Sequence, residues 1–249
     1  MNDCIGFFDS GVGGVSVMRT ARRLLPNENF FYFGDNANAP YGPRSVSEIH
    51  ALCDAAFRKI LDRDVKAIVI ACNTATATYM DILRARVNIP VLGTRPAIRE
   101  AQAARRDGEI LAMATHATLN SPAFRQEMCE CGDHVIPIAG DGLVELVESG
   151  RADTPEAARA LENLLKPYLS RQIDGIVLGC THYPFLLKQF RALFPNASFF
   201  EGGIETSREL VRVLDERGLR SDSTPGTTEY ATSGGDSSLL LMRRLMETP

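Results

Sequence analysis

Two cysteines with matching surroundings are the residues of this chain best suited to chemistry. Cys72 and Cys180 each end a short apolar run and are followed by small polar side chains, in the segments Lys66–Thr74 and Asp174–His182. Short β-rich apolar runs predict buried parallel strands. A residue at the carboxyl end of such a strand lies where open α/β sheets bind their ligands. We therefore predict that the two thiols face each other across one substrate.

Two thiols on opposite sides of one carbon suit proton transfer. One thiolate removes a proton while the other thiol donates one, and the roles swap with the enantiomer. Both cysteines directly precede a predicted helix, whose amino terminus is expected to lower the pKa of each thiol. Asp9 and His182 are the predicted neighbours that tune the two sulfurs and carry their protons.

Two other uses of cysteine fit less well. A single acyl-transfer nucleophile needs a base within reach. His182 lies only two residues after Cys180, so a turn must bring it round, and Cys72 would have no role. Redox pairs usually occur as Cys-x-x-Cys or are exposed.

The first predicted strand, Cys4–Phe8, leads into the glycine-rich turn Asp9–Gly14. The turn matches a nucleotide loop poorly, because its spacing is not Gly-x-Gly-x-x-Gly, no lysine follows, and Asp9 would repel phosphate. A carboxylate and a hydroxyl at a strand end suit a zwitterion better. Asp9 is expected near an ammonium group and the turn amides near a carboxylate.

The chain repeats this design. The predicted strand Glu109–Ala114 leads into Thr115–Thr118 much as the first strand leads into its acidic turn. With the matching cysteine strands, this indicates duplication with pseudo-twofold symmetry. We expect an α/β fold of two pseudo-symmetric αβ lobes with mostly parallel sheets and the active site in the interlobe cleft.

The expected first lobe comprises residues 1–96 plus 207–249, and the second comprises 97–206. Thr94–Ala97 is the expected crossover. Arg95 within it fits an interlobe or solvated ion pair better than a substrate contact. The apolar residues of the last predicted helix, 237–246, either pack back on the protein or form an interface. A homodimer is one compatible assembly.

Bulk properties describe an ordinary globular protein. The 249 residues are 45% hydrophobic and 23% charged, with a net charge of −4. Without a basic stripe, no nucleic-acid partner is expected, and no apolar run is long enough for a membrane span. Met1–Asp3 runs straight into a strand, so no secretory signal is expected. Six cysteines are too sparse for a disulfide framework, and we expect a cytoplasmic protein with reduced thiols.

No metal is expected. Cys129, Cys131 and His134 form a Cys-x-Cys-x-x-His cluster, but a structural zinc needs four ligands. No second Cys/His pair flanks this cluster, so a helix end leading into a strand near Val135 explains it better.

Four motifs in order resemble the glutamate racemase branch of the cofactor-independent aspartate/glutamate racemase superfamily. They are Asp9–Gly14, Gly34-Asp35 with Pro40-Tyr41-Gly42, Ala71–Ala75 and Gly179–Pro184. The resemblance covers essentially the whole chain. It implies two αβ lobes, no cofactor, and interconversion of L- and D-glutamate for peptidoglycan synthesis.

The resemblance also implies roles for individual residues. Cys72 and Cys180 would be the acid/base pair, with Asp9 and His182 as further catalytic residues, and Glu148 would lie near the second cysteine. The implied substrate contacts are Asp9, Ser10, Tyr41, Gly42, Asn73, Thr74, Thr118, Thr181 and His182.

The chain departs from the family pattern at Asn36, Asn38 and Ala39, where many relatives have Thr, Arg and Cys. The lost arginine would affect substrate affinity, not the reaction.

An aspartate racemase is the alternative enzyme, although His182 and Tyr183 favour glutamate. A weakly active binding or regulatory protein is a further alternative, against which both intact cysteines argue. A pyridoxal enzyme would need a lysine placed for a Schiff base, and neither cysteine motif has one.

Overall fold

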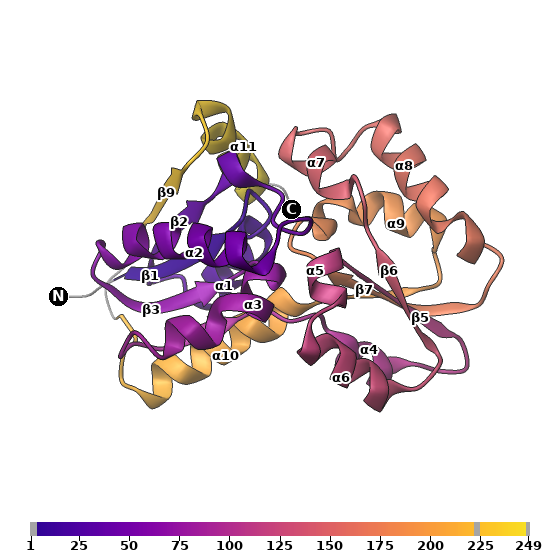
Figure 1. The fold of residues 1–249 in the computed structure, drawn as a ribbon, viewed down its shortest axis with the longest axis horizontal. Helices are drawn as coiled ribbons and strands as arrows, with labels where there is room; N and C mark the ends of the chain where they lie inside the picture. Colours follow the sequence, from indigo (N-terminus) through magenta and orange to yellow (C-terminus); the bar gives the residue numbers. More distant parts are fainter. Residues whose placement is uncertain (1–3, 222–224, 248–249) are drawn as a thin grey trace.

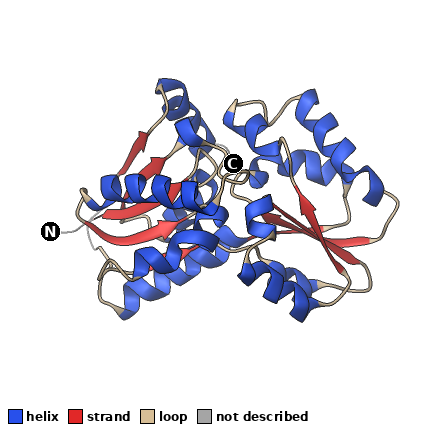
Figure 2. Ribbon diagram, viewed as in Figure 1, coloured by secondary structure: helices blue, strands red, loops and turns tan. Residues whose placement is uncertain are grey.

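The computed structural model describes residues 4–221 and 225–247, and Met1–Asp3 lies outside them. Two parallel sheets, each flanked by helices, form two lobes side by side (Figure 1). The strands lie inside each lobe and the helices cover them (Figure 2). The expected α/β fold with two parallel-sheet lobes is confirmed.

The first lobe holds a five-stranded sheet in the order β4-β3-β1-β2-β9. Its strands are β1 (Cys4–Asp9), β2 (Asn29–Gly34), β3 (Val65–Ile70), β4 (Val91–Gly93) and β9 (Thr228–Thr232). The second lobe holds a four-stranded sheet in the order β6-β5-β7-β8. Its strands are β5 (Glu109–Ala114), β6 (Val135–Ala139), β7 (Ile173–Gly179) and β8 (Ser198–Glu201).

The two sheets repeat one topology. The order β4-β3-β1-β2 of the first corresponds strand for strand to β8-β7-β5-β6 of the second. The pairs β1–β3 and β5–β7 even share a register shift after their first residue pair, at Cys4 and at Glu109. β3 and β7, the two cysteine strands, therefore occupy equivalent positions, as the sequence repetition predicted.

Helices cover both faces of each sheet. Those packed on the first sheet are α1 (Val15–Leu24), α2 (Val46–Leu61), α3 (Asn73–Arg84), α10 (Gly202–Glu216) and α11 (Asp236–Glu247). Those of the second lobe are α4 (Ile98–Ala104), α5 (His116–Leu119), α6 (Pro122–Cys131), α7 (Leu143–Glu148), α8 (Pro155–Leu165) and α9 (Leu187–Leu193). Short 3₁₀ turns are η1 (Asn36–Asn38), η2 (Lys166–Tyr168) and η3 (Tyr183–Leu186).

Local chemistry explains several helix starts. Ser45 and Glu48 form a complete capping box at the start of α2. Thr154 caps α8, with Pro155 at the first helical position. Both starts depend on residues that lie within a few positions of each other in the sequence.

Apolar packing joins the lobes on one side. A single buried cluster runs from α1 and β1 of the first lobe to α7, α8 and α9 of the second. Met242 and Leu245 of α11 belong to it, so this helix packs back on the protein, although Leu240 is 66% exposed. Cys53 and Cys131 are buried in separate clusters on the other faces of the two sheets.

The chain passes between the lobes twice, after β4 and after β8. The two crossovers touch, because a Cβ at Gly202 would lie 1.8 Å from the carbonyl oxygen of Arg95. Only glycine allows so close a backbone approach.

In the described residues, no helix is long and apolar enough to cross a membrane.

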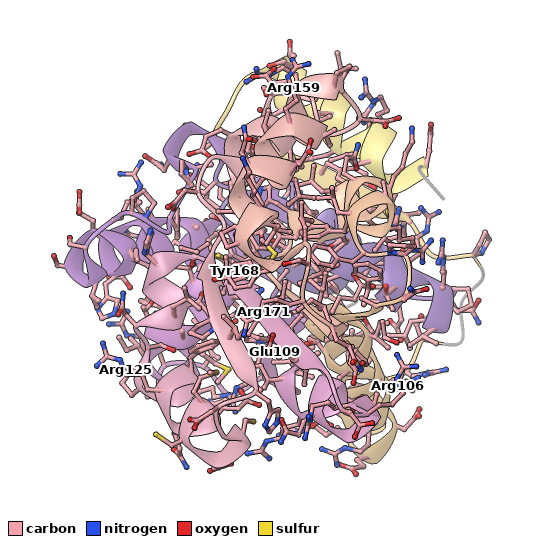
Figure 3. All side chains as sticks on the ribbon, turned by 90° about the vertical axis from the view of Figure 1, so that its right-hand side faces the viewer. Arg106, Glu109, Arg125, Arg159, Tyr168 and Arg171 are labelled. Atoms are coloured by element: carbon pink, nitrogen blue, oxygen red, sulfur yellow. The ribbon has the colours of Figure 1, made fainter. Side chains whose placement is uncertain are left out.

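The end of the second lobe away from the cleft has a mixed charged surface (Figure 3). Arg171 forms an ion pair with Glu109, and its guanidinium lies 5.6 Å from the centre of the Tyr168 ring. Arg125 and Arg159 lie far apart on this face and do not gather into one basic patch. Such paired surface charges contribute little to stability.

Candidate active site

Cys72 and Cys180 line one small cavity between the lobes. Each follows the end of its strand, β3 or β7, and each is nearly buried, at 5% and 7% exposure. The cavity measures about 10 Å³, roughly the space of one water molecule. It is lined by Ser10, Pro40, Tyr41, Gly42, Cys72, Asn73, Thr74, Thr115, Val144, Cys180, Thr181 and His182.

Cys72 lies at the amino terminus of α3. Its thiol donates to Ser10 Oγ at 3.5 Å, and its sulfur accepts from the Ala75 amide at 3.5 Å. Burial, together with the nearby Asp9, raises the pKa of Cys72 to about 12. The expected lowering of this pKa by the helix terminus is therefore wrong, because desolvation of the thiolate exceeds the two hydrogen bonds that favour it.

Asp9 lies behind the cavity and is fully buried. Its carboxylate accepts from the Gly11 amide at 3.0 Å and from Thr181 Oγ1 at 3.0 Å. Burial raises the pKa of Asp9 to about 6, although the charge on His182 opposes the rise. Asp9 can therefore gain or lose a proton near neutral pH.

His182 stands between Cys180 and Glu148. Its Nδ1 lies 3.6 Å from Cys180 Sγ, and its Nε2 lies 2.5 Å from Glu148 Oε1. Burial lowers the pKa of His182, but the contacts with Cys180 and Glu148 outweigh it and hold this pKa well above the usual range. The turn after β7 thus brings His182 back to the sulfur two residues before it.

Glu148 extends from α7 to the glycine-rich turn of the first lobe. Its Oε1 accepts from the Val12 amide at 2.7 Å. A Cβ at Gly11 would lie 1.8 Å from the same oxygen. The turn amides were expected to face a substrate carboxylate. Those of Gly11 and Val12 instead donate to Asp9 and Glu148.

The loop after β2 is held by polar contacts. Tyr41 Oη donates to Asp35 Oδ2 at 2.6 Å, so the hydroxyl is directed to this loop. Asn38 Nδ2 donates to both oxygens of Asp35, at 3.0 and 3.1 Å. Asn38, one of the departures from the family pattern, therefore supports the loop.

A family model described as Asp/Glu/Hydantoin racemase matches residues 11–203. The chain belongs to this racemase family. A curated protein named glutamate racemase from Clostridium botulinum is 40% identical, and the match covers 99% of this chain and 98% of that protein.

Solved structures of racemases agree with this assignment. A glutamate racemase isoform of Bacillus anthracis superposes with a TM-score of 0.88 at 31% identity, covering 99% of this chain and 94% of the other. A glutamate racemase of Francisella tularensis in complex with D-glutamate gives a TM-score of 0.83 at 26% identity, covering 99% and 94%. The resemblance to glutamate racemases inferred from the motifs is thus confirmed.

The candidate cavity also includes residues that lie outside the four motifs. Thr115 and Val144 line it. Thr115 Oγ1 lies 2.8 Å from Thr74 Oγ1 of the other lobe. It follows β5 as Ser10 follows β1, so the duplication was the signal that could have identified it. The predicted substrate residue Thr118 is buried outside this cavity and hydrogen-bonds to Thr115 at 3.1 Å.

A larger groove of about 990 Å³ is lined in part by residues of the two crossovers, among them Arg95 and Gly202, and by Thr118. Neither Cys72 nor Cys180 lines it, so the small cavity is the candidate racemase site despite its size. Among the described residues, no three His, Cys, Asp or Glu side chains are grouped as metal ligands.

Proposed function

We propose that this protein interconverts L- and D-glutamate without a cofactor and supplies D-glutamate for peptidoglycan synthesis. Cys72 and Cys180 would be the two bases. One observation carries the proposal: the thiols line a single cavity from the ends of equivalent strands. The names of the relatives and the D-glutamate bound by the Francisella enzyme support glutamate as the substrate.

The proton transfers follow from the two environments. A thiolate on one side removes the α-proton, and the thiol on the other side protonates the opposite face of the planar carbanion. Asp9, near Cys72, would relay protons there, since its pKa of about 6 lies near neutrality. His182, 3.6 Å from Cys180, would hold the proton that Cys180 gives up. Glu148 would keep His182 oriented.

Substrate contacts are proposed from the residues around the thiols. Ser10, Thr74 and Thr181 offer hydroxyl groups, and Asn73 and the Tyr41–Gly42 segment also line the cavity. Thr118 would act from behind Thr115. Because a cavity of about 10 Å³ is far smaller than glutamate, binding would require the lobes to separate. Cytoplasmic location and a homodimer are further proposals, and light scattering of the purified chain tests the latter.

The deciding experiment is incubation with L- or D-glutamate in heavy water, with α-deuterium followed by NMR. We expect both enantiomers to exchange and to interconvert. Exchange of neither would refute racemisation, and exchange of aspartate alone would make the substrate assignment wrong.

A further inference from the structure

Asn36 links the two lobes beside the candidate site. It lies in η1, directly after β2, and its side-chain Nδ2 donates to Glu148 Oε2 of the second lobe at 2.8 Å. The motif comparison marked this residue only as a departure, and it is absent from the cavity lining.

The amide of Asn36 is fixed in orientation from its other end. The Gly234 amide donates to Thr232 Oγ1 at 2.9 Å, and Thr232 Oγ1 donates to Asn36 Oδ1 at 2.7 Å. Because the Thr232 hydroxyl has one proton, this order makes Oδ1 the acceptor and turns the Nδ2 donor toward Glu148. A flipped amide would set oxygen against a carboxylate.

The line of contacts continues to a sulfur. Glu148 Oε1 contacts His182 Nε2 at 2.5 Å, and His182 Nδ1 lies 3.6 Å from Cys180 Sγ. Cys72 lies outside this line, with Ser10 as its side-chain hydrogen-bond partner.

We propose that Asn36 is a positioning residue that acts through Glu148 and His182 on proton transfer at Cys180, and not at Cys72. This inference rests on the proposed racemase function. It goes beyond it by coupling one of the two thiols to the carboxy-terminal strand β9, through Thr232.

The physical reason is the demand of a nearly buried carboxylate for donors. The Glu148 side chain is only 17% exposed. In the described part of the chain, Asn36 is the residue found donating to its Oε2. Burial raises the pKa of Glu148, but hydrogen bonds from His182, Val12 and Asn36 outweigh it and lower this pKa. Without the Asn36 donor, the proton on His182 moves toward Glu148.

The kinetic test compares Asn36→Ala with Ser233→Ala. Ser233 Oγ accepts from the Ala37 amide of the same turn but does not contact Glu148. Loss of a hydrogen bond to a charged group lowers kcat/KM about ten- to a hundredfold in Asn36→Ala. The kcat/KM of Ser233→Ala should stay within about twofold of that of the unchanged protein.

Isotope effects separate positioning from general damage. Slowing the Cys180 step makes it more rate-limiting. The α-deuterium effect on kcat/KM should then rise for the enantiomer whose deuteron Cys180 removes and fall for the other. Equal changes for both enantiomers would overturn the proposal. If Asn36→Ala does not fold, Thr232→Val, which frees the amide to flip, gives the same test.

A second readout does not depend on the substrate. At pH 7, ¹⁵N NMR of His182 should move toward the neutral ring in Asn36→Ala and stay unchanged in Ser233→Ala. An unchanged His182 signal in Asn36→Ala overturns the coupling even if the protein is a racemase. A shifted signal in a protein that exchanges no glutamate would instead refute the proposed function and retain the coupling.

Discussion

Thr181 donates a hydrogen bond across the cleft to Asp9, with 3.0 Å between Thr181 Oγ1 and Asp9 Oδ2. Asp9 ends β1 of the first sheet, and Thr181 follows β7 of the second. The bond therefore joins the two lobes directly behind the thiols. The carboxylate of Asp9 is fully buried at this point, so its charged form is energetically costly.

Asp9→Asn should stabilise the protein while lowering its activity. The pKa of Asp9 is raised from 3.8 to about 6, so the folded protein holds this proton more tightly than the unfolded chain. The free energy of unfolding therefore rises as the pH falls from about 6 to 3.8, because Asp9 takes up its proton first in the folded protein. Above pH 6 the buried carboxylate stays charged and destabilises the fold. The difference between the two pKa values makes this destabilisation about 3 kcal/mol at pH 7.5.

Urea unfolding at pH 7.5 measures the expected increase in the free energy of unfolding of Asp9→Asn. The rate of racemisation should fall by about two orders of magnitude or more, because the variant has lost the proposed proton carrier. Asp81→Asn, at a side chain that is 92% exposed, is the matched control and should change neither quantity. A less stable Asp9 variant at this pH would contradict the argument from burial.

Cys72→Ser and Cys180→Ser should each abolish racemisation, with a fall in kcat of about a thousandfold or more, because a serine hydroxyl is a far weaker acid at neutral pH. Coupled assays of glutamate turnover in both directions measure this. Cys129→Ser is the control, since Cys129 is exposed and distant from the cavity. Unimpaired turnover in either cavity variant would remove that cysteine from the mechanism.

Sequence patterns were sufficient where the determinants are local. The two cysteine strands depend on neighbours within one element, and both strands were predicted. The direction of the Cys72 pKa was not, because burial and Asp9 act on it only in the folded protein. Asn36 was noted as unusual, but its partner Glu148 is 112 residues away along the chain.

Gly13→Ala should damage the site with limited loss of stability. A Cβ at residue 13 would lie 2.4 Å from His182 Nδ1 and 2.5 Å from Thr181 Oγ1. Moving the imidazole away from Cys180 should lower kcat/KM about a hundredfold, with an overpacking cost of about 1–3 kcal/mol. Steady-state kinetics and thermal unfolding measure the two effects. Gly235→Ala, where a Cβ would meet no atom within 4 Å, should be neutral.

Tyr41→Phe separates the hydroxyl of this residue from the ring. Tyr41 is 1% exposed and its hydroxyl donates to Asp35 Oδ2 at 2.6 Å, so the ring and backbone remain to line the cavity. Removing the donor should cost about 1–3 kcal/mol in unfolding free energy, because Asp35 is also buried. The kcat/KM for glutamate should stay within about tenfold if the hydroxyl only supports the loop. A loss beyond a hundredfold in a folded variant would instead assign the hydroxyl to substrate binding, after the lobes separate and Asp35 releases it.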